Sequence, residues 1–356
     1  KYMSEIPQGA IRFNTDSQKL EFYAQGEWWV MSTDTPILGT GSDPTPGARG
    51  LFAGGYQPGG YQNDIDFLNI ASTGNTQDFG TLNTAVTAGA GVGSRTRALF
   101  AGGYVPGSPN AIAQIDTVVF ASTGNASDYG DLNNSGNIRR GGAGNAVRGL
   151  FAGGGNPTSA TQIDYVTIAT TGTANDLGDL TVARSRFSGA GSAVRGVFAG
   201  GFGGPSPANA WYNVIDFVNI ATLGDAKDFG DLTKLKTWTG SCSNATRMII
   251  GGGDVGPGSG ASAVSETEYL TIASGGNAVI FGDLNAVVDT GTYANSGVAS
   301  PTRGVFNTGL FKNPAATYHN TIYYVQIATQ GSAADFGDLD GKRYGVQTAS
   351  NGHGGL

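Results

Sequence analysis

Arg148-Gly-Leu-Phe-Ala-Gly-Gly154 is the stretch that decides the fold, because variants of it occur six times in the 356 residues. Four copies are strong, and the last two are weaker. The arginines that begin the copies are Arg49, Arg97, Arg148, Arg195, Arg247 and Arg303. Successive arginines are 48, 51, 47, 52 and 56 residues apart. Self-similarity at a nearly fixed spacing predicts a protein built from structural repeats.

Each copy continues in the same way. An Ile-Asp-aromatic segment such as Ile163–Tyr165 is followed by an Ala-Ser/Thr-x-Gly turn and a segment that ends in Gly-x-Leu, as at Gly178–Leu180. A segment of small residues, for example Phe187–Ala193, then leads to the next arginine. Four strands in about 50 residues without a helical period predict one propeller blade. We expect the small-residue strand to be innermost, where blades converge and only Gly, Ala and Ser fit.

With its small-residue strand, its hydrophobic strand ending in Gly-Gly and its third strand with an acidic or aromatic residue, the repeat resembles the kelch family. The resemblance covers roughly residues 49–354 and implies an all-β fold, a six-bladed kelch-like β-propeller of four-stranded antiparallel blades. The fourth-strand tryptophan of the family is replaced by an Asp-Phe-Gly-Asp-Leu pattern. Because of this difference, the resemblance implies the architecture but no kelch partner or activity for this chain.

Closure of the ring is also predicted from the repeats. Before Arg49 there is no small-residue strand, only the turn-rich stretch 39–47, whereas an orphan small-residue segment, Tyr344–Ser350, follows the last copy. We expect residues 344–354 to pair beside Leu51–Ala53 as the innermost strand of the first blade, which would remove two exposed sheet edges. A truncated seventh blade is the alternative.

Residues 1–35 follow no repeat and form a predicted β attachment module, with a linker at 36–48 before the propeller at 49–356. Three short strands are expected at Pro7–Asn14, Lys19–Tyr23 and Glu27–Met31, with turns at Asp16-Ser17 and Gln25-Gly26. A meander of this size buries too little apolar surface to be stable alone. We therefore expect four aromatic side chains to pack on the propeller, another copy or a scaffold: Phe13, Phe22, Trp28 and Trp29.

The module also resembles one that recurs in phage tail fibres and related virion proteins. The resemblance rests on Gly9–Thr15, Lys19–Tyr23 and Gly26–Val30, and it places such a module beside the part anchored to the particle. It implies a virion-surface protein, a tail fibre, spike or head-attached fibre, joined to other virion proteins through the module and present as a homo-oligomer. The alternatives are a capsid decoration protein without a receptor role and a secreted, lectin-like glycan-binding protein or an enzyme of a cell.

Composition and motifs exclude several classes of function. The net charge of −7 argues against nucleic-acid binding, and no apolar run approaches the roughly 18 residues of a membrane span. One cysteine, Cys242, leaves no disulfide framework, and His319 and His353 are too far apart for a local metal motif. No catalytic set stands out, so we expect no metal, no cofactor and no enzyme. The first residue is Lys1 rather than Met, which is consistent with a fragment or a processed product.

A buried ion pair is predicted in most blades. The aspartate of the third strand alternates with apolar residues, so it is expected to face between blades, and a buried carboxylate must be paired. The repeated arginine is the natural partner. The examples are Arg148 with Asp164 and Arg195 with Asp216.

Later copies vary this pair. Glu268 takes the aspartate's place in the fifth copy, and Tyr323 in the sixth leaves Arg303 to find another acceptor or to reach solvent. A ligand site built from these charged residues is the alternative.

Loops between the second and third strands are the predicted binding surface, because they vary while the blade cores stay alike. They carry Tyr56, Tyr61, Tyr104, Trp211, Tyr212 and Tyr318. Flat aromatic rings surrounded by Asn, Gln and Asp suit a host-surface glycan, although a protein partner is also open. The other interpretation is that these rings pack only against their own loops.

Overall fold

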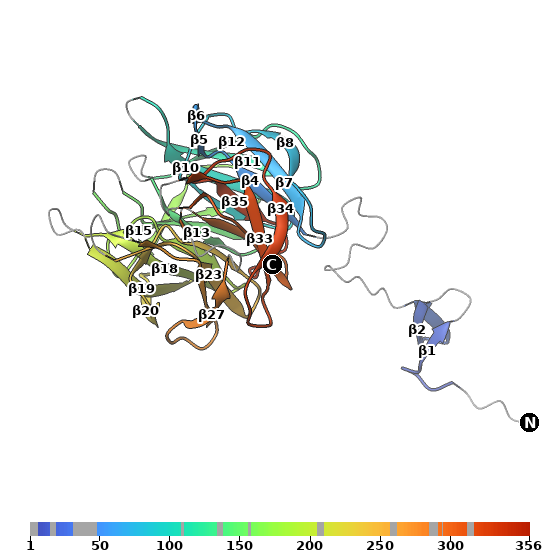
Figure 1. The fold of residues 1–356 in the computed structure, drawn as a ribbon. Coiled ribbons are helices and arrows are strands. Elements are labelled where there is room, and N and C mark those ends of the chain that lie inside the picture. Colours follow the sequence, from blue (N-terminus) through green and yellow to red (C-terminus); the bar gives the residue numbers. More distant parts are fainter. Residues whose placement is uncertain are drawn as a thin grey trace, which may run out of the picture. The chain divides into compact units, whose positions relative to one another are not determined.

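The computed structural model describes residues 6–14, 19–30, 48–107, 110–133, 138–155, 158–204, 210–256, 262–284, 291–293, 295–311 and 317–356. The chain divides into two compact units, Lys1–Pro46 and Gly47–Leu356 (Figure 1). Strands, turns and loops make up all the described residues, with no helix among them. The all-β prediction is therefore confirmed for this part of the chain.

The first unit is a three-stranded antiparallel sheet of β1 (Ile11–Asn14), β2 (Lys19–Ala24) and β3 (Glu27–Val30). Gln25 and Gly26 join β2 to β3 with positive φ angles of 57° and 87°. This backbone matches the twist of a two-residue hairpin. The three predicted strands are confirmed, although the first begins at Ile11 rather than Pro7 because the chain turns at residues 8–9. The Asp16-Ser17 turn and residues 31–47 of the predicted module and linker, Met31 included, lie outside the described residues.

The second unit contains six four-stranded antiparallel sheets, numbered here in order from first to fourth strand. Sheet 1 has β35 (Gln347–Ser350), β4 (Arg49–Ala53), β7 (Asp64–Asn69) and β8 (Gln77–Thr81). Sheet 2 has β9 (Ala90–Gly93), β10 (Arg97–Tyr104), β11 (Ala111–Val119) and β12 (Ser127–Asp131). Sheet 3 has β13 (Gly141–Gly144), β14 (Arg148–Ala152), β15 (Gln162–Thr167) and β16 (Asn175–Asp179).

The remaining sheets follow the same order. Sheet 4 has β17 (Ser188–Gly191), β18 (Arg195–Gly203), β19 (Ala210–Asn219) and β20 (Lys227–Asp231). Sheet 5 has β22 (Gly240–Ser243), β23 (Arg247–Gly251), β26 (Glu266–Thr271) and β27 (Val279–Asp283). Sheet 6 has β29 (Ser296–Ala299), β30 (Arg303–Asn307), β33 (Thr321–Gln326) and β34 (Ala334–Asp338). Short strands in the loops are β5 (Tyr56–Gln57), β6 (Gly60–Tyr61), β21 (Lys236–Thr237), β24 (Asp254–Val255), β25 (Ser262–Ala263), β28 (Thr292–Tyr293), β31 (Leu310–Phe311) and β32 (Thr317–Tyr318).

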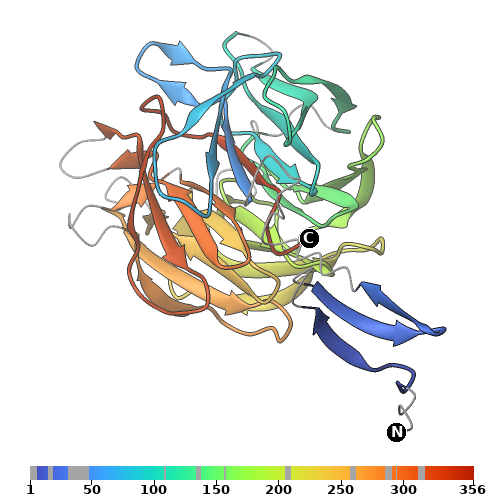
Figure 2. The same cartoon turned by 90° about the vertical axis from the view of Figure 1, so that its right-hand side faces the viewer.

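Sheet 1 combines both ends of the second unit. β35 pairs antiparallel with β4, with Gln347 opposite Ala53 and Ala349 opposite Leu51. The expected pairing beside Leu51–Ala53 is confirmed, although the strand spans only Gln347–Ser350 of the predicted 344–354. Figures 1 and 2 show the strands of sheet 6, in orange, beside β4 and β7 of sheet 1, in blue. β35 therefore belongs to sheet 1 and does not begin a separate sheet.

One hydrogen bond repeats at all six boundaries between sheets. The glycine in the turn before each fourth strand donates its N–H to a carbonyl in the fourth strand of the preceding sheet: Gly124 to Phe79 at 2.7 Å, for example, and Gly74 to Phe336 at 2.8 Å between sheets 1 and 6. The other donors are Gly172, Gly224, Gly276 and Gly331. The first strands also contact one another in the cyclic order β35, β9, β13, β17, β22, β29 and back to β35.

The glycine of the Asp-Phe-Gly-Asp-Leu pattern makes this close approach possible. Gly80 has a φ angle of 148°, and a Cβ atom there would overlap the carbonyl of Gly124 in the next sheet. A side chain would therefore separate the two sheets.

Apolar clusters fill the spaces between adjacent sheets. Between sheets 1 and 2, for instance, Leu51 and Phe79 are buried with Phe100 and Phe120, and each is at most 2% exposed. Sheet 6 packs on sheet 1 in the same way, with Val305 buried beside Phe52 and Leu68. The core is thus a series of similar layers rather than one central cluster.

The repeated arginines do not form the predicted ion pairs. Asp164 lies opposite Phe151 in the β14–β15 register, and Arg148 is three residues from Phe151. Side chains at odd spacings along a strand point to opposite faces, so Arg148 cannot reach Asp164. Instead, Arg148 lies 4.5 Å from the centre of the Tyr165 ring and donates from Nη1 to the Ile220 carbonyl of sheet 4 at 2.9 Å.

The contact between this arginine and a carbonyl of the next sheet occurs in every sheet. Arg195, for which the predicted pairing with Asp216 was also wrong, donates to Ile272 and Ala273 carbonyls of sheet 5. Arg303 of sheet 6 donates to Ile70 and Ala71 of sheet 1, so it has found another acceptor as expected. The other acceptors are Phe120 for Arg49, Ala169 for Arg97, and Ile327 and Ala328 for Arg247. The repeated arginine therefore links neighbouring sheets.

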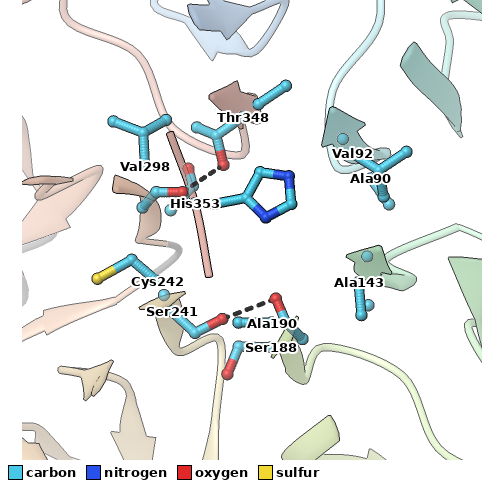
Figure 3. Close-up of a pocket in the computed structure, with 18 of the residues that line it drawn as sticks. Ala90, Val92, Ala143, Ser188, Ala190, Ser241, Cys242, Val298, Thr348 and His353 are labelled. Atoms are coloured by element: carbon cyan, nitrogen blue, oxygen red, sulfur yellow. Dashed lines mark hydrogen bonds between the residues drawn. The ribbon is translucent and has the colours of Figure 1, made fainter. Parts of the chain in front are cut away.

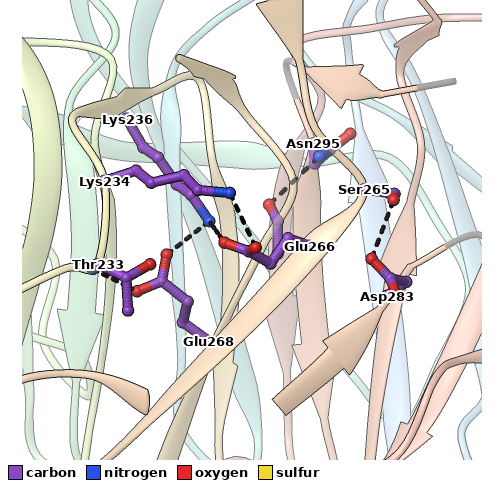
Figure 4. Close-up of polar contacts among 9 residues, drawn as sticks. Thr233, Lys234, Lys236, Ser265, Glu266, Glu268, Asp283 and Asn295 are labelled. Atoms are coloured by element: carbon purple, nitrogen blue, oxygen red, sulfur yellow. Dashed lines mark hydrogen bonds and ion pairs between the residues drawn. The ribbon is translucent and has the colours of Figure 1, made fainter. Parts of the chain in front are cut away.

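The third-strand carboxylates do form buried ion pairs, but their partners precede the first strand of the same sheet. Arg140 contacts Asp164 at 2.8 Å and Arg184 contacts Asp216 at 2.9 Å, with all four side chains at most 1% exposed. Arg343 contacts Asp66, and Lys236 lies between Glu268 and Glu266 (Figure 4). The prediction that these carboxylates are buried and paired was right, but the arginines predicted as their partners were wrong.

In sheets 2 and 6, no cation among the described residues pairs with this position. The carboxylate of Asp116 accepts hydrogen bonds from the Asn83 backbone and side chain at 2.9 and 2.7 Å and from Gln114 at 2.9 Å. Burial raises the pKa of Asp116, because the loss of solvent outweighs these hydrogen bonds. Sheet 6 has Tyr323 at this position and needs no partner cation.

Candidate functional site

A cavity of about 150 Å³ lies among the first strands of the six sheets. Its walls are mostly Gly, Ala and Ser from these strands, and the imidazole of His353 points into it (Figure 3). Small residues are required because the first strands approach one another closely: a Cβ at Gly91, for example, would overlap the Thr348 carbonyl. The small-residue strand is therefore innermost, as predicted.

Residues 351–356 cover one end of this cavity. His353 Nε2 lies 2.7 Å from the Gly93 carbonyl of sheet 2, and Gly354 donates to the Ser243 carbonyl of sheet 5 at 2.8 Å. The Gly355 N–H donates to His353 Nδ1 at 3.1 Å, so the ring accepts at one nitrogen and donates at the other. That pattern requires a neutral imidazole, and burial lowers the pKa of His353 accordingly. We call residues 351–356 the plug.

The opposite end of the cavity is surrounded by residues with left-handed backbone. Ala88, Arg139, Arg186 and Trp238 have φ angles of 57° to 61°, and Gly345 has 66°. Four of these residues donate their N–H to the carbonyl of the residue at the same position in the preceding sheet: Ala88 to Gly345, Arg139 to Ala88, Arg186 to Arg139 and Trp238 to Arg186, at 2.7–2.9 Å. Ala294, at the same position in sheet 6, lies outside the described residues. We call the five described residues the mouth.

Five tyrosines form one continuous cluster near the mouth. Tyr56 contacts Tyr61, Tyr344 and Tyr318 with ring centres 5.2, 5.7 and 6.4 Å apart, and Tyr61 contacts Tyr104 at 5.7 Å. All five rings are half-buried. The structure thus brings together Tyr56, Tyr61, Tyr104 and Tyr318, predicted from separate loops. Sequence reasoning missed Tyr344, which it placed only in the strand that completes sheet 1.

Two arginines at the mouth were also missed. The Arg139 and Arg186 guanidinium carbons lie 5.1 and 5.4 Å from the centre of the Trp238 ring, and Arg186 also lies 4.9 Å from Phe202. Within the described part of the chain neither arginine has a carboxylate within salt-bridge distance. The Nε atom of each is buried without an acceptor there. Because the other repeats carry Ala88, Trp238, Ala294 and Gly345 at this position, no sequence pattern distinguished these arginines.

Trp211 and Tyr212 lie in β19, away from the tyrosine cluster. Trp211 packs edge-on against Phe202 with ring centres 6.1 Å apart, and Tyr212 is opposite Gly201. Since Phe202 contacts Arg186, Trp211 is connected to the mouth through one intervening ring. The predicted binding residues therefore divide into the tyrosine cluster and this Phe202–Trp211 pair.

The first unit has one apolar and one polar face. Ile11, Phe13 and Trp29 are 64%, 58% and 50% exposed, and Phe22 lies on the same face because it is opposite both Ile11 and Trp29. Trp28 differs from the other predicted attachment residues. It lies on the opposite face, where its ring centre is 5.3 Å from that of Tyr23 and 4.1 Å from the guanidinium carbon of Arg12.

Arg12 on this polar face also pairs with Glu21 at 2.8 Å, and the hydrogen bonds from Asn14 and Arg12 lower the pKa of Glu21. In the second unit, the His319 ring packs edge-on against Phe311 with ring centres 4.1 Å apart. Among the described residues there is no group of three or more His, Cys, Asp or Glu side chains placed to hold a metal ion. No helix in that part of the chain is long and apolar enough to cross a membrane.

Comparison with known proteins gives no assignment, because no protein-family model matches the chain and no curated protein is significantly similar to it. The candidate site is a mouth with two arginines that lack a carboxylate partner among the described residues, bordered by the tyrosine cluster and the Phe202–Trp211 pair.

Proposed function

We propose that residues 49–356 form a six-bladed, kelch-like β-propeller that serves as a binding module without catalytic activity. The proposal is supported by the boundary hydrogen bonds and arginine contacts that recur six times, including between sheets 6 and 1. In such a ring the first strands surround the central cavity, and the loops between second and third strands gather at the end opposite the plug.

We further propose that the protein is a virion structural protein, a tail fibre, spike or head-attached fibre, whose propeller binds a host surface or neighbouring particle proteins. The observation that carries the binding role is the concentration of half-buried aromatic and basic side chains at the mouth, including Tyr56, Tyr104 and Arg186. Aromatic and arginine side chains carry much of the energy of protein interfaces. The virion assignment itself rests on the resemblance of the first unit to phage-fibre modules.

The apolar face of the first unit fits a role in attachment to other virion proteins. Exposed Ile11, Phe13 and Trp29 form an apolar surface on a sheet too small to be stable alone. Packing of this face on a virion protein or on another copy would remove that surface from water. A capsid decoration protein would use the same face without needing the mouth, and a secreted lectin would use the mouth without needing the first unit.

The experiment compares variants of both regions on intact particles. Tyr104→Ala and Trp211→Ala are expected to weaken adsorption to host cells at least tenfold while the protein stays on the particle, located by electron microscopy. Val194→Ala is the control at the plug end, where the side chain is 63% exposed. Phe13→Ser with Trp29→Ser should instead remove the protein from particles. Normal adsorption by the Tyr104 and Trp211 variants would favour the decoration role, and absence of the unaltered protein from particles would refute the virion proposal.

A further inference from the structure

Arg139 and Arg186 are exceptional among the half-buried or buried arginines of the second unit. Arg140, Arg184 and Arg343 each contact an aspartate, and the six repeated arginines donate to carbonyls of the next sheet. For Arg139 and Arg186, the described residues contain no acceptor of either kind within hydrogen-bond distance. Asp254 acts on Arg186 electrostatically without forming a salt bridge to it. Within this part of the chain, therefore, no salt bridge neutralises either positive charge.

The backbone holds the two arginines as neighbours. Both residues have left-handed φ angles, 61° and 60°, and are linked by the hydrogen bond from Arg186 N to Arg139 O at 2.9 Å. Left-handed backbone in non-glycine residues is unfavourable and is concentrated at functional sites. Both guanidinium groups also pack against the Trp238 ring. The arrangement is therefore pre-organised before any ligand arrives.

The electrostatics favour an anion at this position. Burial, and then the charge of Arg139, lower the pKa of Arg186 to about 10, so Arg186 remains protonated at neutral pH. Burial also lowers the pKa of Arg139. Two like charges held together are unfavourable, and an anion between them would relieve the repulsion.

We propose that the mouth binds the carboxylate of an acidic sugar residue through Arg139 and Arg186, with the neighbouring tyrosines against the sugar rings. Guanidinium groups bind a carboxylate through two parallel hydrogen bonds, which a neutral sugar cannot accept. Tyr344 precedes Gly345 of the mouth, and ring contacts run from Tyr344 through Tyr56 and Tyr61 to Tyr104. A chain of sugars held at the arginines would therefore extend over the tyrosine cluster. This inference rests on the proposed binding function of the mouth and names its ligand class.

The test measures binding of defined oligosaccharides to the purified full chain by isothermal titration calorimetry. The probes are a uronic-acid oligosaccharide, a sialylated oligosaccharide, the carboxyl-reduced neutral form of each, and a sulfated analogue. We expect at least one carboxylated probe to bind, and its reduced form to bind at least tenfold more weakly. Arg186→Gln and Arg139→Gln should each weaken binding of the carboxylated probe at least tenfold. Arg95→Gln, an exposed arginine outside the mouth, is the control for loss of one charge and should have no effect.

Unchanged melting temperatures would show that the two glutamine variants fold. Equal binding of the carboxylated and reduced probes, preference for the sulfated probe, or unchanged binding by the glutamine variants would overturn the inference. Host adsorption that depends on Tyr104 and Trp211, without binding of any carboxylated probe, would refute the acidic-sugar ligand and leave the proposed function standing. If adsorption is unchanged in the Tyr104 and Trp211 variants and sugar binding is unchanged in the Arg139 and Arg186 variants, both the acidic-sugar ligand and the proposed binding function are refuted.

Discussion

The buried pair of Arg184 and Asp216 in sheet 4 offers the sharpest test of how buried charges stabilise the second unit. Arg184→Leu removes the cation that pairs with Asp216, whose carboxylate keeps hydrogen bonds from the Thr181 N–H and hydroxyl at 3.1 and 2.6 Å. The variant also removes the donors to the Val214 and Phe198 carbonyls at 2.9 and 3.2 Å. Breaking a buried pair in this way lowers the free energy of unfolding by about 3–5 kcal/mol.

The expected shift in melting temperature follows from the size of the second unit. About 310 residues belong to this unit, and unfolding entropy is about 2.1 cal/mol/K per residue, or roughly 0.65 kcal/mol/K in total. A loss of about 3–5 kcal/mol therefore lowers Tm by roughly 5–8 °C. Thermal unfolding followed by circular dichroism at neutral pH would measure the shift.

Two further variants separate this pair from other contacts. Arg195→Leu removes hydrogen bonds to the Ile272 and Ala273 carbonyls and should cost only about 1–2 kcal/mol, since its guanidinium is partly exposed and leaves no buried charge behind. Replacing both Arg184 and Asp216 by Leu should recover at least half of the single variant's loss. Sheet 6, with Tyr323 in place of the acid, shows that the position can be built without a cation. An Arg184→Leu protein that melts within about 1 °C of the original, or a double variant that melts lower still, would refute the reasoning.

Three other predictions concern the plug, the sheet boundaries and the single cysteine. Since burial lowers the pKa of His353, the unfolded state takes up a proton below about pH 6.5 that the folded state does not, and Tm should fall as pH drops from about 6.5 toward 5. His353→Gln should flatten this pH dependence of Tm, and an unchanged dependence would show that the plug histidine does not cause it. Gly130→Ala should lower Tm by several degrees, because its Cβ would overlap the Gly172 carbonyl and its φ angle is 145°; the exposed Gly107→Ala, with open space around it, is the matched comparison in a thermal melt. Burial raises the pKa of the Cys242 thiol, so a thiol reagent at neutral pH should label it only after denaturation, and rapid labelling of the folded protein would contradict its burial.

Several features of the fold could be predicted because their causes are local. The repeated Arg-x-Leu-Phe-Ala-Gly-Gly and Gly-x-Leu segments alternate, turn and recur along the chain, and these patterns do not depend on distant residues. The missing strand before Arg49 and the surplus strand after Leu339 predicted the β35–β4 pairing, since an unpaired sheet edge must be satisfied somewhere. The clustering of Tyr56, Tyr61 and Tyr104 could be predicted because their loops occupy equivalent positions in successive repeats.

Tertiary structure alone decided which charges meet. Arg148 and Arg140 are equally plausible partners of Asp164 in the sequence, but the β14–β15 register places Arg148 on the opposite face of the sheet and leaves the position to Arg140. The mouth is the second example, because Arg139, Arg186 and Trp238 belong to three different sheets and become neighbours only through hydrogen bonds between those sheets. Strand patterns are encoded within a few residues, whereas the direction of a side chain and the identity of its neighbour depend on register and on how successive sheets pack.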